Sequence, residues 1–507
     1  MSAKASAHAE MGLGQHKDEL LTVRGMARTD LGQTGKAAAG RPGPVSPSTL
    51  VAVLVFLAVV STAVASLGAP LLVSIAGVEH VSLASSQWSL TITLLVGAVA
   101  VPLMGRLGDG RHRRATTLTG VATVTAGCVL SALPAGFAIM LTGRALQGVG
   151  LGLVPLATAI ARDNLPADRS RRTIVILGTT TAAGIGAGYP LAGLFAEYLG
   201  LYSAFWFGAA VSALALAASI LALPASPGRR APVDLTGAAV LGLGVAGLLL
   251  VLAEGPAWGW ASPVTLTVAV VSVALLAGWV VLELRTRYPL IDLRLLRHPQ
   301  VLAANASGLL VSIGFYPLLS LVVRYVQTPA HAGYGFGAPV VIAGLMLTPL
   351  SLASFAASRV ARPLATRFSR EWVVAGSVMV LIAALLVFLL ARSAYWQVIV
   401  SMALVGFGVG CVFAVNPVQI VAGVPGDETG SAMSFYQLVR TVGYSIASAL
   451  SATVLILYIR PGHAFPANAG YSTAALVSIA VLVAGLAVSA FFARTARRQP
   501  EDRRISR

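Results

Sequence analysis

The chain has 507 residues, of which 57% are hydrophobic and only 10% charged, and its formal net charge is +17. This composition excludes an ordinary water-soluble domain. It also argues against nucleic acid as a partner, because the basic residues lie in short connections between apolar stretches, where anionic lipid headgroups attract them.

Fourteen apolar stretches divide the chain between Leu50 and Ala493. Each is long enough to cross the hydrocarbon core of a bilayer as a helix, which takes about 20 residues. The predicted spans are 50–77, 84–104, 115–134, 136–160, 174–195, 201–223, 235–254, 263–284, 300–323, 338–358, 372–391, 395–421, 431–459 and 471–493. The predicted fold class is therefore an all-α polytopic membrane protein with 14 transmembrane helices.

Basic residues lie almost entirely on one side of these spans. Thirty of the 35 Lys and Arg residues fall in the two tails and the even-numbered connections. Three (Arg324, Arg392, Arg460) lie on the other side, and two (Arg144, Arg440) lie inside spans. The positive-inside rule then predicts that both termini are cytoplasmic. The Arg-, Ala- and Gly-rich composition is typical of a GC-rich bacterial genome, so the expected location is the bacterial inner (cytoplasmic) membrane.

The segments outside the spans are polar. Residues 1–48 have mixed charge, are rich in Gly and Ala, and end in a Pro-rich run at 41–44, which predicts a disordered cytosolic tail. Residues 494–507 form a short basic tail, also predicted to be cytosolic.

A weak internal repeat with a spacing of about 258 residues divides the spans into two halves. The matching positions are Leu107 with Leu364 in the loops after spans 2 and 10, Gly148, Gly150 and Gly152 with Gly406, Gly408 and Gly410, and residues 166–168 with 425–427. The repeat predicts an N-terminal six-helix bundle at 49–224 and a C-terminal one at 300–493. Residues 225–299 would hold two linker helices and their cytosolic loops.

The connection after span 2, residues 105–114, reads Gly-Arg-Leu-Gly-Asp-Gly-Arg-His-Arg-Arg. Glycines permit a tight turn, and Asp109 can accept hydrogen bonds from a helix N-terminus or an arginine. The connection resembles the signature loop of the major facilitator superfamily, G-x-L-a-D-R-x-G-R-K, and departs from it at Gly110 and His112. This resemblance predicts a gate at Gly105, Asp109, Arg113 and Arg114.

Span 4 contains Arg144 and Gln147 in the pattern R-x-x-Q-G of the same superfamily. A guanidinium inside a span is costly and usually faces a polar interior. In relatives this arginine lies near the central cavity and is tied to proton coupling or substrate binding, which makes Arg144 a coupling candidate together with Asp109. The alternative is a structural arginine that backbone carbonyls satisfy.

Span 5 contains Gly184, Gly188, Pro190 and Gly193. It resembles the antiporter motif G-x-x-x-G-P-x-x-G-G, in an imperfect register. Glycine and proline here would bend the helix and let the facing bundle approach closely. The motif favours export, and a general small-residue packing face is the alternative.

With the linker segments 254–260 and 288–297, these motifs resemble the fourteen-span drug:proton antiporter family (multidrug efflux type) over residues 50–460. One departure concerns the acid that this family usually has midway along span 1. Ser61 occupies that place, and no carboxylate lies near the middle of any predicted span. Glu79, Glu197 and Glu254 all lie near outer ends, so proton coupling would have to use other groups.

A cavity is expected between the two bundles, with spans 1, 4, 9 and 12 lining it and spans 5 and 13 nearby, if the family arrangement holds. The substrate-binding candidates are Arg144, Gln147, Tyr189, Asn305, Tyr316, Asn416, Gln419, Tyr436, Gln437 and Arg440. Each could instead serve only to join helices. Two arginines with no acid opposing them favour an anionic or neutral amphipathic substrate.

The function predicted from the sequence is secondary active export of small amphipathic molecules, such as drugs or natural products, by alternating access with proton antiport. The expected partners are the substrate, protons and membrane lipids, and the expected state is a monomer. No P-loop, metal cluster or nucleophile triad is present, so we expect neither a cofactor nor enzyme activity. The alternatives are an exporter or flippase of a lipid or acylated precursor, and a non-transporting membrane sensor or scaffold.

Overall fold

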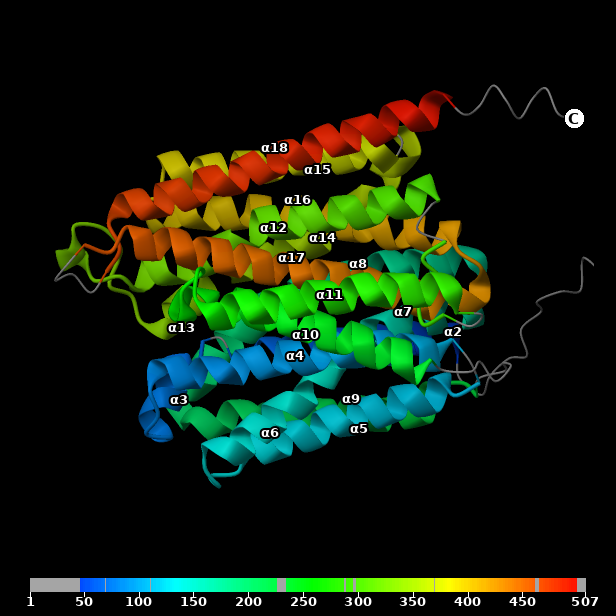
Figure 1. Cartoon of the computed structure of the whole chain (residues 1–507), viewed down its shortest axis with the longest axis horizontal. Helices are drawn as coiled ribbons and strands as arrows, with labels where there is room; N and C mark the ends of the chain where they lie inside the picture. Colours follow the sequence, from blue (N-terminus) through cyan, green and yellow to red (C-terminus); the bar gives the residue numbers. More distant parts are fainter. Residues whose placement is uncertain are drawn as a thin grey trace, which may run out of the picture. The chain divides into compact units, whose positions relative to one another are not determined.

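The computed structural model describes residues 46–68, 70–109, 111–225, 234–286, 289–294, 298–368, 370–460 and 465–498. Thirteen helices in this part of the chain are long and apolar enough to cross a membrane. The 33-residue helix α8 (Ala167–Leu199) is not one of these thirteen but packs between them, so each of the fourteen predicted spans has a helical counterpart (Figure 1). The predicted all-α membrane fold is confirmed. The tail at residues 1–45, the loop residue Gly110 and the end of the chain from residue 499 lie outside the described residues.

The first six predicted spans correspond to α2 (Pro47–Ser66), α3 (Leu72–Val78), α4 (Leu83–Gly108), α5 (Arg113–Ala132), α6 (Phe137–Gly148), the 3-10 turn η1 (Val149–Gly152), α7 (Leu153–Asn164), α8 and α9 (Leu201–Ala222). These helices pack on one another: α2 contacts α8 and α9, and α5 contacts α6 and α9. They form the N-terminal bundle.

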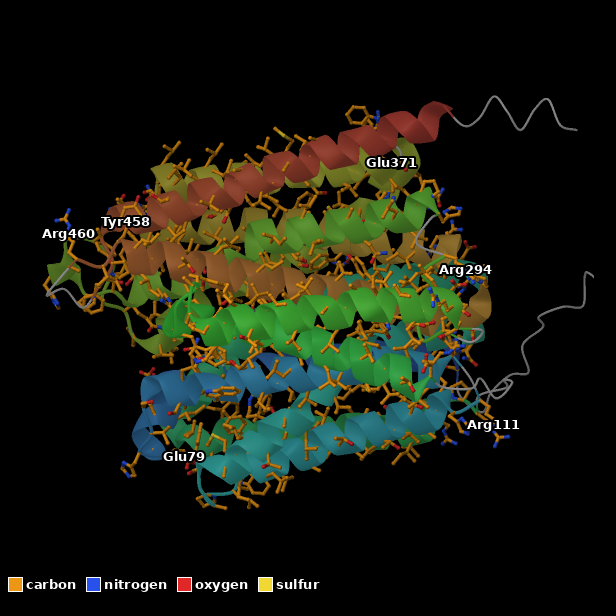
Figure 2. All side chains as sticks on the ribbon, viewed as in Figure 1. Glu79, Arg111, Arg294, Glu371, Tyr458 and Arg460 are labelled. Carbon is orange, nitrogen blue, oxygen red and sulfur yellow. The ribbon has the colours of Figure 1, made fainter. Side chains whose placement is uncertain are left out.

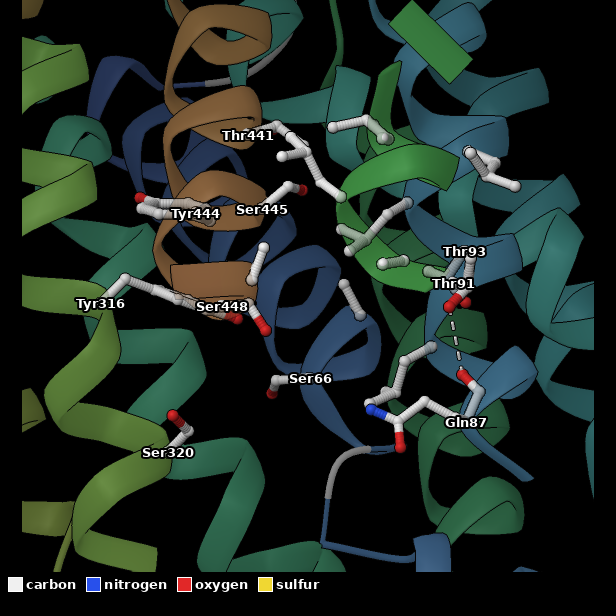
Figure 3. Close-up of a pocket in the computed structure, with 18 of the residues that line it drawn as sticks. Ser66, Gln87, Thr91, Thr93, Tyr316, Ser320, Thr441, Tyr444, Ser445 and Ser448 are labelled. Atoms are coloured by element: carbon white, nitrogen blue, oxygen red, sulfur yellow. Dashed lines mark hydrogen bonds between the residues drawn. The ribbon is translucent and has the colours of Figure 1, made fainter. Parts of the chain in front are cut away.

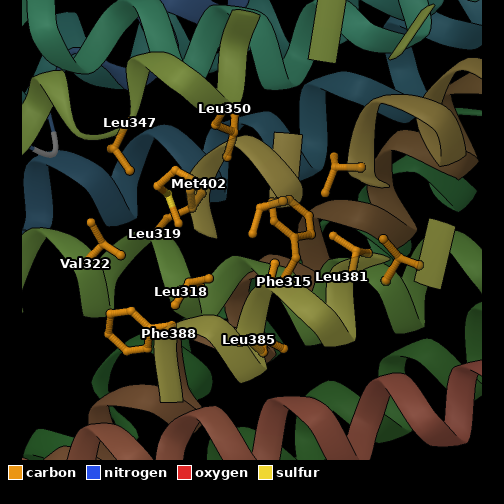
Figure 4. Close-up of a cluster of buried hydrophobic side chains, with 14 of the residues drawn as sticks. Phe315, Leu318, Leu319, Val322, Leu347, Leu350, Leu381, Leu385, Phe388 and Met402 are labelled. Carbon is orange, nitrogen blue, oxygen red and sulfur yellow. The ribbon is translucent and has the colours of Figure 1, made fainter. Parts of the chain in front are cut away.

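The last six predicted spans correspond to α12 (Pro299–Gln327), α13 (Val340–Leu345), α14 (Thr348–Arg367), α15 (Arg370–Leu390), α16 (Tyr395–Gly423), α17 (Thr429–Leu457) and α18 (Asn468–Arg498). In this C-terminal bundle α16 contacts α14 and α15, and α12 contacts α17 and α18. Its core joins Phe315 and Leu319 of α12 to Leu350 of α14, Phe388 of α15 and Met402 of α16 (Figure 4). Burying such side chains from four helices makes the bundle one packed unit.

Polar caps set where several of these helices begin. The side chain of Ser46 accepts a hydrogen bond from the Thr49 amide at the start of α2, and Ser82 does the same at the start of α4. Such caps satisfy amides that have no partner within the helix. Because Ser46 caps a helix, the boundary predicted for the N-terminal tail, residue 48, lies slightly inside α2.

The bounds predicted for spans 1 and 10 differ from the helices in the structure. Span 1 was predicted as one helix over 50–77, but α2 ends at Ser66 and α3 begins at Leu72, with Gly68 and Pro70 between them. The break has a packing reason: a Cβ at Gly68 would lie 2.7 Å from the Arg144 guanidinium. Span 10 was predicted to end at residue 358, but α14 continues to Arg367, so Leu364 lies in a helical turn and not in a loop.

The two bundles meet along two seams. On one, α8 packs on α14 and α16; on the other, α4 packs on α17. In α8, a Cβ at Gly184 or Gly188 would collide with α2, and one at Gly186 would collide with Ser351 of α14. The helix with the antiporter-like motif is therefore held closely from both sides, as small-residue faces allow.

The two linker helices, α10 (Leu235–Trp258) and α11 (Pro263–Arg285), do not stand apart from the bundles. Helix α10 packs on α11 and also on both α4 and α17, so it covers the second seam. The Glu283 carboxylate of α11 accepts hydrogen bonds from the amides of Leu290 (3.1 Å) and Ile291 (3.3 Å). It thereby holds both side chains, which are fully buried, in a cluster with Leu438 of α17.

The glycine rows of the repeat occupy similar places in the two bundles. A Cβ at Gly148 would collide with the Thr93 carbonyl of α4, and one at Gly406 would collide with the Leu350 carbonyl of α14. In each half, the fourth span uses a glycine to approach the backbone of the second. The domain boundaries themselves stay a prediction.

We expect Gly148→Ala to destabilise the protein by about 1–3 kcal/mol, because the added methyl group overpacks a backbone contact. Gly376 in α15 is the matched control, since a Cβ there would meet nothing within 4 Å. Gly376→Ala should leave stability unchanged or raise it by up to about 1 kcal/mol through helix propensity. Thermal unfolding of the purified protein in detergent measures both, and equal apparent Tm values for the two variants would contradict the packing argument.

Candidate functional site

The first polar site joins the two bundles at one end of the helices, here called the Asp109 end. Asp109 follows the last residue of α4, and its carboxylate accepts hydrogen bonds from the amides of Gly430 and Ser431 (2.9 Å) and from the Ser431 hydroxyl. Both amides lie in the first turn of α17, where they have no partner within the helix and the helix dipole favours a negative charge. A Cβ at Gly105 would collide with Ser434, so this glycine lets α4 lie directly on α17.

Two arginines add further ties between the bundles at the same end. Arg106 forms an ion pair with Glu428, with 3.6 Å between Nη1 and Oε1. Arg162 of α7 donates to the carbonyls of Val424 (3.0 Å) and Pro425 (3.1 Å). These contacts close the cleft between the bundles at the Asp109 end.

The other two predicted gating residues act within the N-terminal bundle. Arg113 is buried, forms an ion pair with Asp163 and donates to the Gly108 carbonyl. Arg114 donates to the Ile220 carbonyl of α9 at 2.9 Å. Among the described residues, these two arginines hold the loop after α4 against its own bundle, whereas Gly105 and Asp109 contact the facing bundle.

Burial changes the acidity of Asp109. Removal from water raises its pKa from 3.8 to about 7, and hydrogen bonds from Ser431 and Gly430 oppose that rise. If the bundles separated at this end, the carboxyl would return to water and its pKa would fall back toward 3.8. The closed arrangement would then bind a proton that an open one would release between about pH 4 and 7, so closure would be favoured as the pH falls through that range.

Arg144 is fully buried in α6, and its partners are carbonyl oxygens. It donates to Ser89 of α4 (3.0 Å), to Val64 and Ala65 of α2 (3.4 Å each), and to the Gln147 side chain. Because α2 ends at Ser66, Val64 and Ala65 lie in its last turn, where carbonyls have few partners within the helix. The Val64 carbonyl also accepts a hydrogen bond from the Leu67 amide at 3.3 Å. Arg144 thus caps a helix that ends within span 1. This agrees with the alternative interpretation of Arg144 as a structural arginine whose partners are backbone carbonyls.

Arg440 of α17 is also buried, with 2% of its surface exposed. It donates to the Tyr444 hydroxyl (2.7 Å) and to Gln437 (3.4 Å), and its guanidinium carbon lies 3.5 Å from the centre of the Phe413 ring. Aromatic faces attract a cation most strongly when water is excluded. Neither Arg144 nor Arg440 has a carboxylate partner among the described residues.

A cavity of about 230 Å³ lies between the bundles, toward the end opposite Asp109 (Figure 3). Its lining reaches Ser66 at the end of α2, Gln87 near the start of α4 and Arg324 in the last turn of α12. Helix α10 supplies Leu249, Leu252, Ala253 and Pro256, so a linker helix forms one wall. The described structure is therefore closed at the Asp109 end and hollow at the other.

Hydroxyl groups dominate the polar part of the lining. Twelve lining residues are Ser, Thr or Tyr, Arg324 is the charged one, and none of the described lining residues is Asp or Glu. Figure 3 shows Thr441, Ser445 and Ser448 along one face of α17, with Thr91 and Thr93 of α4 across from them. A largely preformed site with apolar walls and a few placed polar groups suits a small amphipathic molecule.

Of the predicted substrate-binding residues, Tyr189, Tyr316 and Gln437 line this cavity. The other seven (Arg144, Gln147, Asn305, Asn416, Gln419, Tyr436, Arg440) are buried between helices and do not belong to its lining. For example, Asn416 donates to the Ala304 carbonyl and to Ser307, each at 3.0 Å.

The hydroxyl face of the cavity and Arg324 are not among the substrate-binding residues predicted from the sequence. A signal was available: positions 441, 445 and 448 recur at helical spacing, and so do Tyr316, Ser320 and Arg324. The wall from α10 had no local signal, because its position depends on packing against α4 and α17.

The chain matches the Major Facilitator Superfamily over residues 51–448 and over 301–506, and it belongs to that family. It is 28% identical to the tetracenomycin C resistance and export protein of Streptomyces glaucescens over 84% of this chain and 78% of the relative. It is also 28% identical to the multidrug resistance protein Stp of Mycobacterium tuberculosis, over 74% and 69% of the two chains. These relatives agree with the multidrug efflux type indicated by the motifs.

Solved structures support the fold. The human organic anion transporter MFSD10 (TETRAN) aligns with a TM-score of 0.59 at 19% identity, covering 88% of this chain and all of that one. The POT family transporter PepTSo aligns with the same TM-score at 15% identity, covering 90% and 99%. With its thirteen apolar helices among the described residues, the chain is a multi-pass membrane protein of the Major Facilitator Superfamily.

We expect the Asp109 end to respond to pH. With spin labels at the exposed positions Arg169 and Ala422, one on each bundle, lowering the pH from 8 to 5 should shift the distance distribution toward the closed form. A pKa of about 7 in the closed form limits the change in the closed-to-open ratio to about 100-fold.

Asp109→Asn is the matched variant, because it keeps the size of the side chain and removes the titration. Its distance distribution should not change over this pH range. The same pH response in both proteins would assign the titration to another group.

Proposed function

We propose that this protein exports small amphipathic molecules by alternating access, and that proton entry drives the transport. The observation that carries the proposal is the cavity between two bundles that Asp109, Arg106 and Arg162 tie together at one end. If the bundles rock about the cavity, the ties at the Asp109 end break and the same cavity faces the other side of the membrane. The names of the relatives, an antibiotic exporter and a multidrug resistance protein, support export of drug-like compounds.

Proton coupling is proposed to use Asp109. The charge and pKa of this carboxyl depend on whether the bundles are closed around it, which is what a coupling group requires. Closure at this end takes up a proton and opening releases it. Arg144 is proposed to contribute by holding the end of α2 beside the cavity, since its guanidinium is used by carbonyls.

The Asp109 end is proposed to be cytoplasmic, in the bacterial inner membrane, and the protein is proposed to act as a monomer. Charge placement supports this orientation, because Arg111 and Arg294 lie at one end while Glu79 and Arg460 lie at the other (Figure 2). The cavity would then face the outside, as expected for a transporter that has just released its substrate.

A thiol at an exposed position reports the orientation directly, because the native thiols of Cys128 and Cys411 are buried. In intact cells, an Arg460→Cys variant should react with a membrane-impermeant maleimide. Arg111→Cys should react only after lysis. The reverse pattern would invert the proposed topology.

The lining of the cavity argues against a lipid or an acylated precursor as the cargo. Twelve hydroxyl-bearing residues line it, and α10 covers the seam between α4 and α17 through which an acyl chain could otherwise enter. A covered cavity that mixes hydroxyls with apolar side chains suits a compact amphiphile better than a long acyl chain.

Flux in sealed proteoliposomes tests the function. With a pH gradient of two units, one-for-one proton antiport can accumulate a fluorescent aromatic substrate up to about 100-fold. Collapsing the gradient with an ionophore should abolish the accumulation. Asp109→Asn should lose the gradient dependence while still binding the substrate, because the cavity lies away from residue 109.

Two outcomes would contradict the proposal in different ways. Accumulation that persists without a gradient would exclude proton antiport. No flux of any tested compound, with or without a gradient, would support the sensor or scaffold alternative.

A further inference from the structure

One face of α12 carries a line of polar side chains into the cavity. Tyr316, Ser320 and Arg324 are spaced four residues apart, so they lie on the same side of the helix, and all three line the cavity. Arg324 is exposed, and its guanidinium has no ion pair or hydrogen bond among the described residues. A cation without a partner therefore stands at the mouth of the cavity.

Serines from α17 extend this polar face. The Ser320 and Ser451 hydroxyl oxygens lie 3.4 Å apart across the two helices, and Ser448 lines the cavity as well. Figure 3 shows Ser320, Tyr316 and Ser448 on the same side of the cavity. Hydroxyls next to a guanidinium can donate additional hydrogen bonds to an oxyanion.

The opposite part of the cavity is mostly apolar, although Gln87, Thr91 and Thr93 of α4 also line it (Figure 3). Leu90, Leu94 and Leu95 of α4 and Leu249 and Leu252 of α10 line it. The cavity thus has a basic, hydroxyl-rich side and a leucine side, which matches a molecule with an anionic group at one end of an apolar body.

Arg324 is the charged residue of the described lining, and two further cations, Arg144 and Arg440, are buried in helices that flank the cavity. Cations attract an anion and repel another cation, most strongly where water is excluded.

We propose that the cavity binds amphipathic organic acids, with their carboxylate or phenolate on Arg324 and their apolar body against the leucines of α4 and α10. The inference rests on the proposed function, because it takes this cavity as the substrate site. It makes Arg324 the residue that selects anions over cations.

Binding of three matched probes tests the proposal with the full-length protein in nanodiscs of zwitterionic lipid. The probes are pyrenebutyrate, its methyl ester and the pyrenebutylammonium cation, which share one apolar body. We expect the acid to bind more tightly than the ester, and the cation to bind most weakly. In Arg324→Gln the acid should lose about 10- to 100-fold in affinity, the range for a hydrogen bond to a charged group, while the ester changes less than about twofold.

Arg460→Gln is the matched control. Arg460 is exposed at the same end of the helices but does not line the cavity, so its loss should leave all three affinities unchanged. Arg324→Lys should keep part of the preference for the acid, because it keeps the charge and loses the fork geometry. Binding of the ester shows that each variant is folded.

Three results would overturn the proposal: equal loss for acid and ester in Arg324→Gln, no loss for the acid, or the same loss in Arg460→Gln. Displacement of the acid when phosphatidylglycerol is added to the nanodiscs would assign the site to a lipid headgroup, and would overturn the organic-acid assignment too.

The two proposals can fail separately. Acid binding that depends on Arg324, without flux in proteoliposomes, would keep the anion site and remove the transport function. Proton-driven flux with no preference that depends on Arg324 would keep the transport function and remove the anion site.

Discussion

The structure depends on one constraint: polar backbone groups inside a bilayer must find partners within the protein. Unbroken helices meet it by themselves, and most of this chain is built of them. Where a helix stops within a span, the fold supplies other partners. The end of α2 is the clearest case, because the carbonyls of Val64 and Ala65 are taken up by Arg144, a buried cation that itself needs acceptors. The carbonyls at the end of α2 and the Arg144 guanidinium thus serve as hydrogen-bond partners for each other. The end of α2 also borders the cavity.

The same reasoning explains how much of the fold could be predicted. Length of apolar runs and placement of basic residues identify the fourteen helices, because both follow from the bilayer itself. The break after Ser66 was not predicted because the run 50–77 is long and mostly apolar, although Gly68 and Pro70 give a local signal for a break. The extension of α14 to Arg367 was not predicted, because its charged residues indicated a loop. A helix can, however, extend beyond the hydrocarbon core.

Prediction of the site was limited in a similar way. Asp109 could be predicted because the residues of its loop have the spacing of a known motif. The motif does not indicate its partner, which the structure shows to be the first turn of α17. Arg144 and Arg440 stood out because a charge in a span is rare, yet both lie behind the cavity wall. Arg324 was counted only as an exception to the charge asymmetry. Its role in the cavity depends on the pairing of α12 with α17, which no local pattern encodes.

The linker helices change what separates the binding space from the lipid. Helix α10 lies across the seam between α4 and α17, and four of its residues face the cavity. Residues 235–285 thus form part of the cavity wall in addition to connecting the two bundles. Excising them would remove one side of the chamber and admit acyl chains where the cargo is proposed to sit. The linker helices therefore help to define the volume that a substrate could occupy.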